Sequence, residues 1–424
     1  MIQLNHKEPE KLSIQDLCLQ GKKIIMRVDF NVPIDADGSI TDTTRIQAAL
    51  PSIFYLLKQS KALILMSHLG RPDHPFNHKF SLLPVAKALE TFIRRPVKMA
   101  PDCIGQEVKE MAINLKQGDV LLLENLRFHP AELQPSIDPD FAKELASLAD
   151  VYVNDAFATA HRKHSSTYTI TQFFSKTAAA GFLLEKEVSV LSEILNTPKR
   201  PFYALIGGAK ISTKIGLIKN LLKKTDLLFL SGGMAYTFFK VLGYEVGQSM
   251  FDPKFFKLAK DILEDFHDKI ILPKDARIAK NSHPDTPIKV VDLAKEGIPK
   301  GYSGLDIGPK TIHHFATLFQ HANTILWNGP VGVCELPAYS QGTYELAYHL
   351  TQLDAVTIVG GGDLVAAINQ AGLKDKMTYI STGGGATLDY LEHGTLPCIQ
   401  ALSNKSPKIS ISPNKENRKD KEHL

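Results

Sequence analysis

The stretch TIVGGGDLVAAI, residues 357–368, joins an apolar run to a helical pattern through three consecutive glycines. A second stretch, YISTGGGATLDYLE at 379–392, has the same arrangement. Bare backbone at the start of a helix lets N–H groups approach an anion, so both stretches predict phosphate binding. The alternative is that the glycines only form tight turns. Neither stretch matches the P-loop or the dinucleotide-binding fingerprint.

Eight short apolar runs alternate along the chain with longer amphipathic segments. They are KKIIMRVDF (22–30), ALILMSH (62–68), DVLLLEN (119–125), DVYVNDA (150–156), FYALIGG (202–208), DLLFLSGG (226–233), NTILWNG (323–329) and AVTIVGGG (355–362). Because the runs are continuous, they predict strands buried on both faces, and therefore parallel α/β sheets. Ligands bind such sheets beyond the carboxyl ends of the strands.

The bulk properties favour a two-domain globular protein of the cytoplasm. A chain of 424 residues is too long for one ordinary core. Its net charge of +4 gives no indication of nucleic acid or an anionic membrane as partner. The polar N-terminus does not resemble a signal peptide, and no apolar run approaches the ~20 residues that span a bilayer. The four scattered cysteines predict neither disulfides nor zinc.

The two halves of the chain carry different residues at the ends of their strands. Charged and hydrogen-bonding side chains stand there in the first half: Asp29, Asn31, His68, Arg71, Arg127, Asp155 and Arg162. Glycines stand there in the second half: Gly207, Gly208, Gly232, Gly233, Gly329 and Gly360–Gly362. The segment 181–196 has helical apolar spacing and is the expected connector. The polar stretch from Ser403 is expected to be a flexible tail.

Arginines near the strand ends suit a small anionic substrate, because guanidinium groups bind phosphate and carboxylate bidentately. Arg45 joins the arginines already named, whereas Arg27 lies within a strand pattern and is interpreted as structural. His68 and His161 are candidates for a general base or for a hydrogen-bonding role.

Three charged groups in the second half are candidates for a phosphate and metal site. Lys210 and Lys214 share a face if a helix begins near Ile211, and then either hold a phosphate or form a solvated surface. Asp363 is a candidate N-cap and a candidate Mg²⁺ ligand. Glu335 either accepts hydrogen bonds from a ribose or is a surface carboxylate.

Eleven motifs, taken in order, resemble the phosphoglycerate kinase family. They are RVDFNVP, SHLGRP, ENLRFHPAE, NDAFATAHRKHSS, GFLLEKE, GGAKISTK, SGGMAYTF, GLDIGPKT, LWNGPVGVCE, VGGGD and STGGGA, and the resemblance extends from about residue 12 to about Asn404.

The resemblance implies two doubly wound, Rossmann-like α/β domains with parallel sheets, joined by a hinge helix. Residues 1–184 would bind 3-phosphoglycerate or 1,3-bisphosphoglycerate, residues 185–402 would bind Mg-ADP or Mg-ATP, and 403–424 would be the tail. The acid substrate would contact Asp29, Asn31, Arg45, His68, Arg71, Arg127 and Arg162. The nucleotide would contact Gly208, Lys210, Lys214, Gly232, Gly233, Gly304, Asn328, Glu335, Gly360, Gly361, Gly362 and Asp363, and Asp363 would hold Mg²⁺. In that family the C-terminal end of the chain also packs back onto the N-terminal domain, so the resemblance implies the same here.

The implied reaction is an in-line phosphoryl transfer after domain closure, as in glycolysis. The two nucleophiles, a carboxylate and a phosphate oxygen, are ionised near neutral pH, so no general base is needed. Catalysis then depends on positioning the reactants and stabilising charge. Arg45, Lys214 and the N–H groups of Gly383, Gly384 and Gly385 are the expected catalytic groups. The chain departs from the family at Leu364, where the family usually has Thr or Ser.

Rival interpretations are a nicotinamide dehydrogenase, a nucleic-acid-binding protein and a catalytically impaired homologue that acts as a binding protein. The first lacks its glycine fingerprint, and the near-neutral net charge and scarcity of basic–aromatic patches argue against the second. We expect a cytoplasmic monomer acting on small molecules, without nucleic acid or membrane partners.

Overall fold

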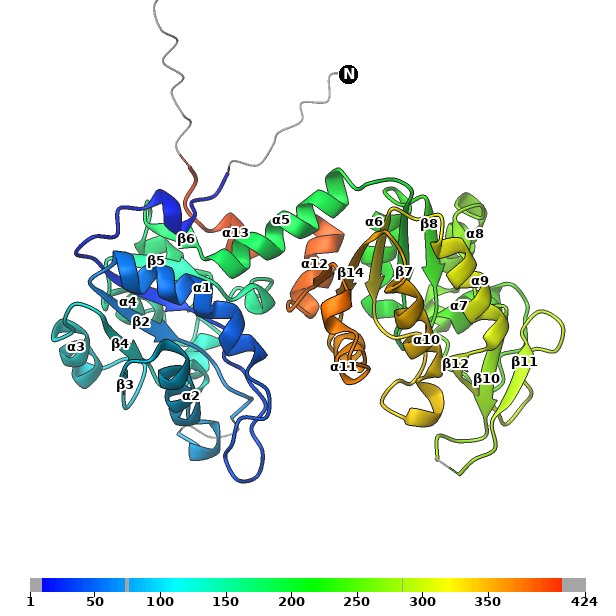
Figure 1. Ribbon diagram of the computed structural model, residues 1–424, viewed down its shortest axis with the longest axis horizontal. Coiled ribbons are helices and arrows are strands. Elements are labelled where there is room, and N and C mark those ends of the chain that lie inside the picture. The colour runs from blue at the N-terminus through cyan, green and yellow to red at the C-terminus, as the bar shows by residue number, and fades with distance from the viewer. Residues whose placement is uncertain (1–9, 73–75, 284, 406–424) are drawn as a thin grey trace, which may run out of the picture.

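The computed structural model describes residues 10–72, 76–283 and 285–405. Two six-stranded parallel sheets lie at opposite ends of an elongated molecule, and helix α5 (Phe182–Asn196) runs from one to the other (Figure 1). The predicted connector at 181–196 is therefore a helix, as expected.

The first sheet has the strand order β3-β4-β2-β1-β5-β6. Its strands are β1 (Lys23–Arg27), β2 (Ala62–Met66), β3 (Val97–Met99), β4 (Asp119–Leu122), β5 (Val151–Asn154) and β6 (Ala178–Ala180). Helices α1 (Thr44–Gln59) and α2 (Leu83–Ile93) pack on the face that carries Ile24 and Met26. Helices α3 (Gln106–Ile113), α4 (Phe141–Ala146) and α5 pack on the face that carries Ile25. Burial on both faces confirms the interpretation of the continuous apolar runs.

The second sheet has the order β15-β14-β13-β7-β8-β9. Its strands are β7 (Phe202–Ile206), β8 (Leu227–Leu230), β9 (Ile270–Ile271), β13 (Thr324–Asn328), β14 (Val356–Gly360) and β15 (Tyr379–Ile380). Helices α9 (Pro309–Phe319), α10 (Gln341–Leu350) and α11 (Gly362–Gln370) cover the face of Leu205 and Trp327. The opposite face, which carries Ala204 and Leu326, is covered by α6 (Ile215–Leu222), α8 (Phe256–Asp265) and α12 (Gly385–His393).

A third sheet, antiparallel and three-stranded, was not predicted. Its order is β11-β10-β12, formed by β10 (Asp275–Ala279), β11 (Lys289–Asp292) and β12 (Ser303–Ile307). Helix α7 (Ala235–Val241) packs against it through Tyr236 and Phe239. The segments DARIA, KVVD and SGLDI mix polar and apolar residues because part of this sheet stays accessible. A search for continuous apolar runs therefore misses them.

Short 3₁₀ turns connect many of these elements. They are Ile14–Asp16, His78–Phe80, Leu126–Phe128, Pro130–Glu132, Phe157–Thr159, Thr169–Phe173, Ile211–Thr213, Pro253–Phe255, Pro337–Tyr339 and Lys374–Lys376. Within the described ranges, no helix combines the length and the apolar composition needed to cross a membrane.

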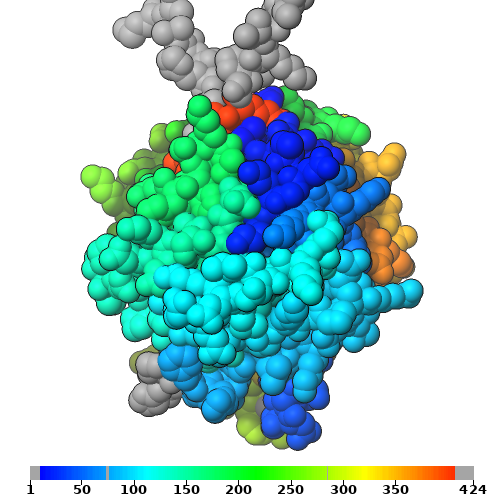
Figure 2. All heavy atoms as spheres, turned by 90° about the vertical axis from the view of Figure 1, so that its left-hand side faces the viewer, coloured from blue at the N-terminus to red at the C-terminus, as the bar shows by residue number. Residues whose placement is uncertain are grey.

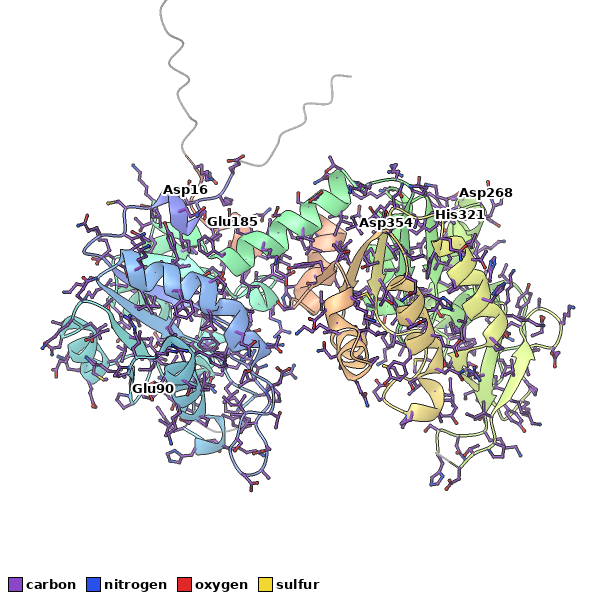
Figure 3. The ribbon with its side chains drawn as sticks, in the orientation of Figure 1. Asp16, Glu90, Glu185, Asp268, His321 and Asp354 are labelled. Atoms are coloured by element: carbon purple, nitrogen blue, oxygen red, sulfur yellow. The ribbon has the colours of Figure 1, made fainter. Side chains whose placement is uncertain are left out.

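The C-terminal end of the described chain returns to the first sheet, as the resemblance implied. After helix α13 (Pro397–Gln400), the N–H of Ser403 donates to Ala178 O at 2.9 Å, and Ser403 O accepts from Leu12 N at 2.8 Å. Figure 2 shows this segment, in red, directly beside the first described residues, in blue. Figure 3 shows Asp16 and Glu185 at the same end of the first half.

The expected tail therefore does not begin at Ser403. Lys405 Nζ lies 3.1 Å from Asp16 Oδ2, and Lys405 N donates to Glu10 O at 2.7 Å. Residues 403–405 are thus held by the first half through long-range pairing that the local composition could not reveal. The rest of the expected tail, 406–424, lies outside the described residues.

Replacing Leu402 with alanine should destabilise the protein. Leu402 is 3% exposed and belongs to the hydrophobic cluster beneath α5. We expect the free energy of unfolding to fall by about 2–5 kcal/mol through lost burial and a residual cavity. Urea denaturation measures this, and Ile113→Ala, at a position 67% exposed, is the control with a change within about 0.5 kcal/mol. Equal effects in the two variants would contradict the docking of this segment.

Candidate active site

The first cluster of predicted residues lies where β1 and β2 end. Asp29 follows β1, and its Oδ2 lies 2.5 Å from Nη1 of Arg45 in the first turn of α1. Asn31 follows two residues later and accepts from Gly70 N at 2.8 Å through its Oδ1. Asp29 is 8% exposed, whereas Arg45 is 39% exposed. The carboxylate therefore holds an accessible guanidinium in place at the edge of the sheet.

The buried Arg27 determines which nitrogen of His68 carries the proton. Arg27 is structural, as predicted: it is fully buried, donates to Ser166 Oγ at 2.8 Å, and lies 3.8 Å from Glu132 Oε1. Its Nη2 is 3.1 Å from Nδ1 of His68. A guanidinium can only donate, so Nδ1 accepts and the proton lies on Nε2.

His68 is held neutral. Burial, and then the positive charges of Arg27 and Arg127, keep the pKa of His68 well below its usual value. A neutral imidazole with its proton on Nε2 is a hydrogen-bond donor at that atom. Of the two roles considered for His68, this geometry favours hydrogen bonding to an anion over general-base catalysis.

Three further arginines, Arg71, Arg127 and Arg162, add positive charge near these strand ends without a direct ion pair among the described residues. Arg127 donates to Gly70 O at 2.6 Å, and its buried Nε has no partner among the described residues. Burial, more than the neighbouring cations, lowers the pKa of Arg127 to about 10, so it stays charged at neutral pH. Arg71 and Arg162 are exposed. Within the described part of the chain, none of the three has a carboxylate oxygen within 4.0 Å.

A cavity of about 370 Å³ lies beyond the carboxyl ends of the second sheet. The predicted nucleotide residues that line it are Gly208, Gly232, Gly233, Gly304, Glu335 and Asp363. Gly232 has φ +69°, and a Cβ there would lie 2.6 Å from the backbone N and O of Gly208. Only glycine allows this approach of two turns, which together form part of the cavity wall.

Lys214 and Asn328 form a polar pair beside this cavity. Lys214 Nζ donates to Asn328 Oδ1, and Asn328 Nδ2 has no partner among the described residues. Lys214 is 9% exposed, and burial lowers its pKa to about 8, although the charge of Asp363 acts in the opposite direction. An anion bound to this ammonium would stabilise the charged form of Lys214, which burial destabilises by removing water.

The chain does not form the helix from Ile211 that would have placed Lys210 and Lys214 on one face. A 3₁₀ turn occupies Ile211–Thr213, and α6 begins after Lys214. Lys210 precedes the turn and is exposed. The 3₁₀ turn lies between the two lysines. Lys214 is buried and Lys210 is exposed, although their spacing in the sequence gave no reason to expect this difference.

The turn at Gly360–Asp363 starts α11 without a side-chain cap. The N-cap is Gly361, with φ +101°, so Asp363 is not the N-cap that was considered. Asp363 lies in the first helical turn and is exposed at the cavity. Val365 N donates to Gly361 O at 2.9 Å, and the preceding N–H groups of the helix have no intrahelical acceptor. They are available to an anion.

Leu364 does not disturb this turn. Its side chain is fully buried in the cluster that contains Trp327 and Val359. The departure from the family pattern therefore adds apolar packing beneath the turn, while the backbone donors of the first helical turn remain.

The second triple glycine lies against the first half of the molecule. A Cβ at Gly383 would lie 2.4 Å from Phe157 Cε1, and one at Gly385 would lie 3.5 Å from His161 Nε2. His161 in turn accepts from Arg162 Nε at 3.0 Å. A backbone turn of the second half thus adjoins the loop that carries Arg162.

Glu187 is a residue that the sequence analysis missed. Its carboxylate, fully buried on α5, accepts from Ser381 Oγ at 2.8 Å and from Thr382 N at 2.7 Å. It therefore fixes the strand end that leads into Gly383. The sequence did contain a signal for Glu187: it lies three residues after Leu184 and four before Leu191, which places its carboxylate on the apolar face of a helix.

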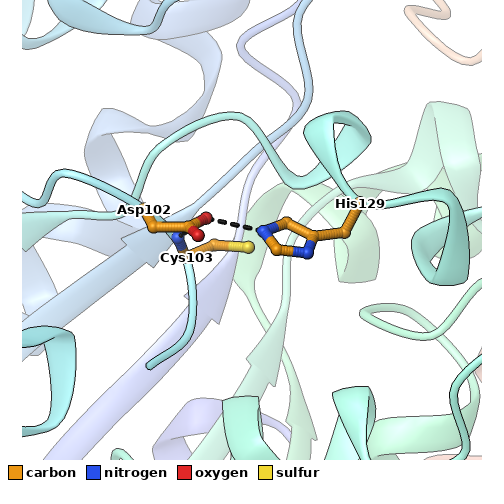
Figure 4. A group of neighbouring side chains, drawn as sticks. All are labelled: Asp102, Cys103 and His129. Atoms are coloured by element: carbon orange, nitrogen blue, oxygen red, sulfur yellow. Dashed lines mark hydrogen bonds and ion pairs between the residues drawn. The ribbon is translucent and has the colours of Figure 1, made fainter. Parts of the chain in front are cut away.

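Among the described residues, a single carboxylate and one cluster of three side chains are candidates to hold a cation. One is Asp363 at the cavity. The other is Asp102, Cys103 and His129, whose ligand atoms lie within 4.8 Å of one another (Figure 4). In that trio Asp102 Oδ1 already lies 2.7 Å from His129 Nε2, and burial raises the pKa of the Cys103 thiol. A cation in that trio would have to break the hydrogen bond between Asp102 and His129 and displace the proton of the Cys103 thiol. Binding at Asp363 requires neither step.

The comparisons with known proteins agree on one family. The sequence model described as phosphoglycerate kinase matches residues 14–394. Phosphoglycerate kinase of Chlamydia muridarum is 48% identical over 400 residues, covering 93% of this chain and 99% of its own length. That of Chlorobaculum tepidum is 49% identical over 401 residues, with 93% and 100% covered. The solved structure of phosphoglycerate kinase from Coxiella burnetii superposes with a TM-score of 0.81 at 38% identity, covering 92% of this chain and 98% of that one.

The buried ammonium of Lys214 should make anion binding depend on pH. Because the pKa of Lys214 is lowered to about 8, its charge is present below that value and is lost as pH rises through it. We expect the affinity for ADP to fall about tenfold between about pH 7 and pH 9. Calorimetric titration at each pH measures this.

The matched variants are Lys214→Arg and Lys210→Arg. A guanidinium keeps its charge throughout this pH range, so Lys214→Arg should flatten the profile. Lys210→Arg, at the exposed lysine, should leave the profile as in the wild type. A pH dependence that survives Lys214→Arg would assign the titration to another group.

Proposed function

Since the chain belongs to the phosphoglycerate kinase family, we propose which of its residues bind the substrates and which stabilise the transferred group. The protein is a kinase of glycolysis that transfers a phosphoryl group reversibly between 1,3-bisphosphoglycerate and ADP, giving 3-phosphoglycerate and ATP. Its substrates are these small phosphorylated molecules.

The first half is proposed to bind the phosphoglycerate. The observation that supports this most strongly is that Arg71, Arg127 and Arg162 have no carboxylate oxygen of the described residues within 4.0 Å, because such a set favours a small polyanion. The binding residues are Asp29, Asn31, Arg45, His68, Arg71, Arg127 and Arg162. Asp29 orients Arg45, and Arg27 orients His68.

The second half is proposed to bind the nucleotide along the glycine-lined cavity. Lys214, Asn328 and the first turn of α11 would meet the phosphates, because they provide a buried ammonium and free backbone donors. Lys210 would reach them from the surface. Gly208, Gly232, Gly233, Gly304 and Glu335 would enclose the nucleoside.

Asp363 is proposed to hold Mg²⁺ together with the nucleotide phosphates. A single exposed carboxylate beside free backbone donors fits this ion, which typically takes one or two carboxylates, several waters and phosphate oxygens. When bound, Mg²⁺ would neutralise negative charge on the phosphate oxygens.

The catalytic residues are proposed to be Arg45, Lys214, Gly384 and Gly385. The carboxylate of 3-phosphoglycerate and the terminal phosphate of ADP are both ionised, so no residue has to remove a proton. The two cationic side chains would stabilise charge on the equatorial oxygens, and the N–H groups at the start of α12 would donate to the same oxygens. Leu364 gives no reason to propose an impaired homologue, because its side chain packs away from these groups.

Two α/β domains, 1–184 and 185–402, are proposed to close on each other about α5. The phosphoglycerate and nucleotide residues lie on different sheets, and closure would bring them together and exclude water. A cytoplasmic monomer is the proposed form, without nucleic acid or membrane partners. The free cysteines are compatible with a reducing compartment.

Replacing Arg45 with alanine should abolish most turnover. With Mg-ATP, 3-phosphoglycerate and a trap for the acyl phosphate, ADP formation should fall about 10²- to 10³-fold. Arg95→Ala is the matched control, because that exposed arginine donates to a backbone oxygen, Gly118 O at 3.2 Å, and forms no ion pair with any described residue. Normal turnover in folded Arg45→Ala protein would remove the arginine from the catalytic set.

Domain closure should be visible in small-angle scattering. We expect the radius of gyration to decrease when 3-phosphoglycerate and Mg-ADP are both present, because the arginines and the glycine-lined cavity would then act on one pair of ligands. Each ligand alone is the control. The same radius with no ligand and with both ligands would contradict closure about α5.

A further inference from the structure

A buried chain of polar groups lies behind the proposed phosphoglycerate residues. Glu132 ends the 3₁₀ turn Pro130–Glu132, and Ser166 precedes the 3₁₀ turn Thr169–Phe173. Both side chains are fully buried, so neither can touch a substrate. They are connected to the proposed site through Arg27 and His68.

The hydrogen bonds along this chain have a fixed direction. Arg27 Nε donates to Ser166 Oγ at 2.8 Å, because a guanidinium group can only donate. The hydroxyl then directs its own proton at Glu132 Oε1, 2.7 Å away, and Glu132 Oε2 accepts from Ser166 N at 3.0 Å. The other two nitrogens of Arg27 engage Val28 O and, at 3.1 Å, Nδ1 of His68. The guanidinium is therefore fixed at all three of its nitrogens.

The hydroxyl of Ser166 keeps Arg27 from pairing directly with Glu132. Arg27 Nη2 lies 3.8 Å from Glu132 Oε1, which is beyond hydrogen-bond distance. A bidentate pair of guanidinium and carboxylate is among the strongest contacts that an arginine makes. Without the hydroxyl, Arg27 would turn towards Glu132, and its Nη2 would move away from His68.

We propose that Ser166, together with Glu132, is a positioning residue for the phosphoglycerate: it fixes Arg27, and Arg27 in turn keeps the proton of His68 on Nε2. This Nε2 hydrogen-bonds to no described residue, and it is the proposed donor to the anionic substrate. If His68 lost its bond at Nδ1, the proton could move there, and Nε2 would then present a lone pair that repels an anion. The inference rests on the proposed phosphoglycerate site and adds two residues that touch no substrate.

The first test is the binding of 3-phosphoglycerate to the full-length protein. Calorimetric titration should give Ser166→Ala an affinity about 3- to 12-fold weaker than that of the wild type, the effect of one lost hydrogen bond. Its affinity for Mg-ADP, which is proposed to bind to the other half of the molecule, should change less than twofold. In steady-state assays, KM for 3-phosphoglycerate should rise while kcat stays within twofold, because His68 is proposed to bind the substrate and not to act in the transfer.

Ser165→Ala is the matched control. Ser165 is the neighbouring serine, 1% exposed, and its Oγ donates to a backbone oxygen, Ala131 O at 2.7 Å. Each variant loses one buried hydroxyl, so both should lower the Tm by a similar amount, but only Ser166→Ala should weaken the binding of 3-phosphoglycerate. Glu132→Gln, which keeps the size of the side chain, is the second variant and should act in the same direction as Ser166→Ala.

The tautomer of His68 is the readout that a merely structural role would not change. Long-range ¹H–¹⁵N spectra distinguish the two ring nitrogens, and His68→Gln assigns the signals. The charged and titratable groups that face His68 are Arg27, Arg45, Arg127 and His164. Burial and these groups hold the pKa of His68 low, so the wild type and Ser165→Ala should keep a neutral ring with its proton on Nε2 from about pH 6 to pH 8. Ser166→Ala should show both tautomers, and the pKa of His68 should rise because Nδ1 has lost its donor.

The same affinity and the same His68 tautomer in Ser166→Ala and Ser165→Ala would overturn this inference. A weaker affinity without a change of tautomer would overturn it too, because the effect would then not pass through His68. Both outcomes leave the proposed phosphoglycerate site intact if the wild type binds 3-phosphoglycerate. Wild-type protein that binds none would overturn that site, and this inference with it, so the two failures are distinguishable.

Discussion

Helix α5 is held between the two sheets by two buried carboxylates, and the relative position of the substrate residues depends on this attachment. Asp155, at the end of β5, accepts from the N–H groups of Leu183 at 2.8 Å and Leu184 at 3.1 Å in the first turn of α5. Burial raises the pKa of Asp155 to about 7. A carboxylate at a helix N-terminus satisfies donors that have no intrahelical partner. Glu187, one turn further along, is bonded to the strand end that leads into Gly383.

The two halves of the proposed site would bind anions by different physical means. The first half uses guanidinium groups whose geometry is fixed by neighbours such as Asp29 and by the backbone at Gly70. Long charged side chains suit a small substrate with several negative groups, because each guanidinium group can bind one of these groups. The second half uses bare backbone and one buried ammonium, that of Lys214. Close approach of a flat, elongated nucleotide, as proposed for this half, would require turns without side chains, and glycines follow several of its strands.

Much of the fold could be read from local pattern. The eight apolar runs all contain strands of the two parallel sheets, because burial on both faces demands continuous apolar sequence. The antiparallel sheet of β10–β12 was not predicted, since its segments mix polar with apolar residues and β11 and β12 are partly accessible. A helix from Ile211, which would have put Lys210 and Lys214 on one face, does not form because a 3₁₀ turn comes first.

The sequence by itself determined the order of strands and turns, the residues that end each strand, and the family to which those motifs point. These depend on neighbours in the chain, whose spacing alone decides which side chains share a strand end. The tertiary structure decided which groups are buried, paired or left unpaired. Lys214 is buried, Glu187 accepts a hydrogen bond from Ser381, and Ser403 accepts one from Leu12. Ser231 and Tyr236 line one cavity. Each of these depends on contacts between residues far apart in the chain, and no local spacing encodes them.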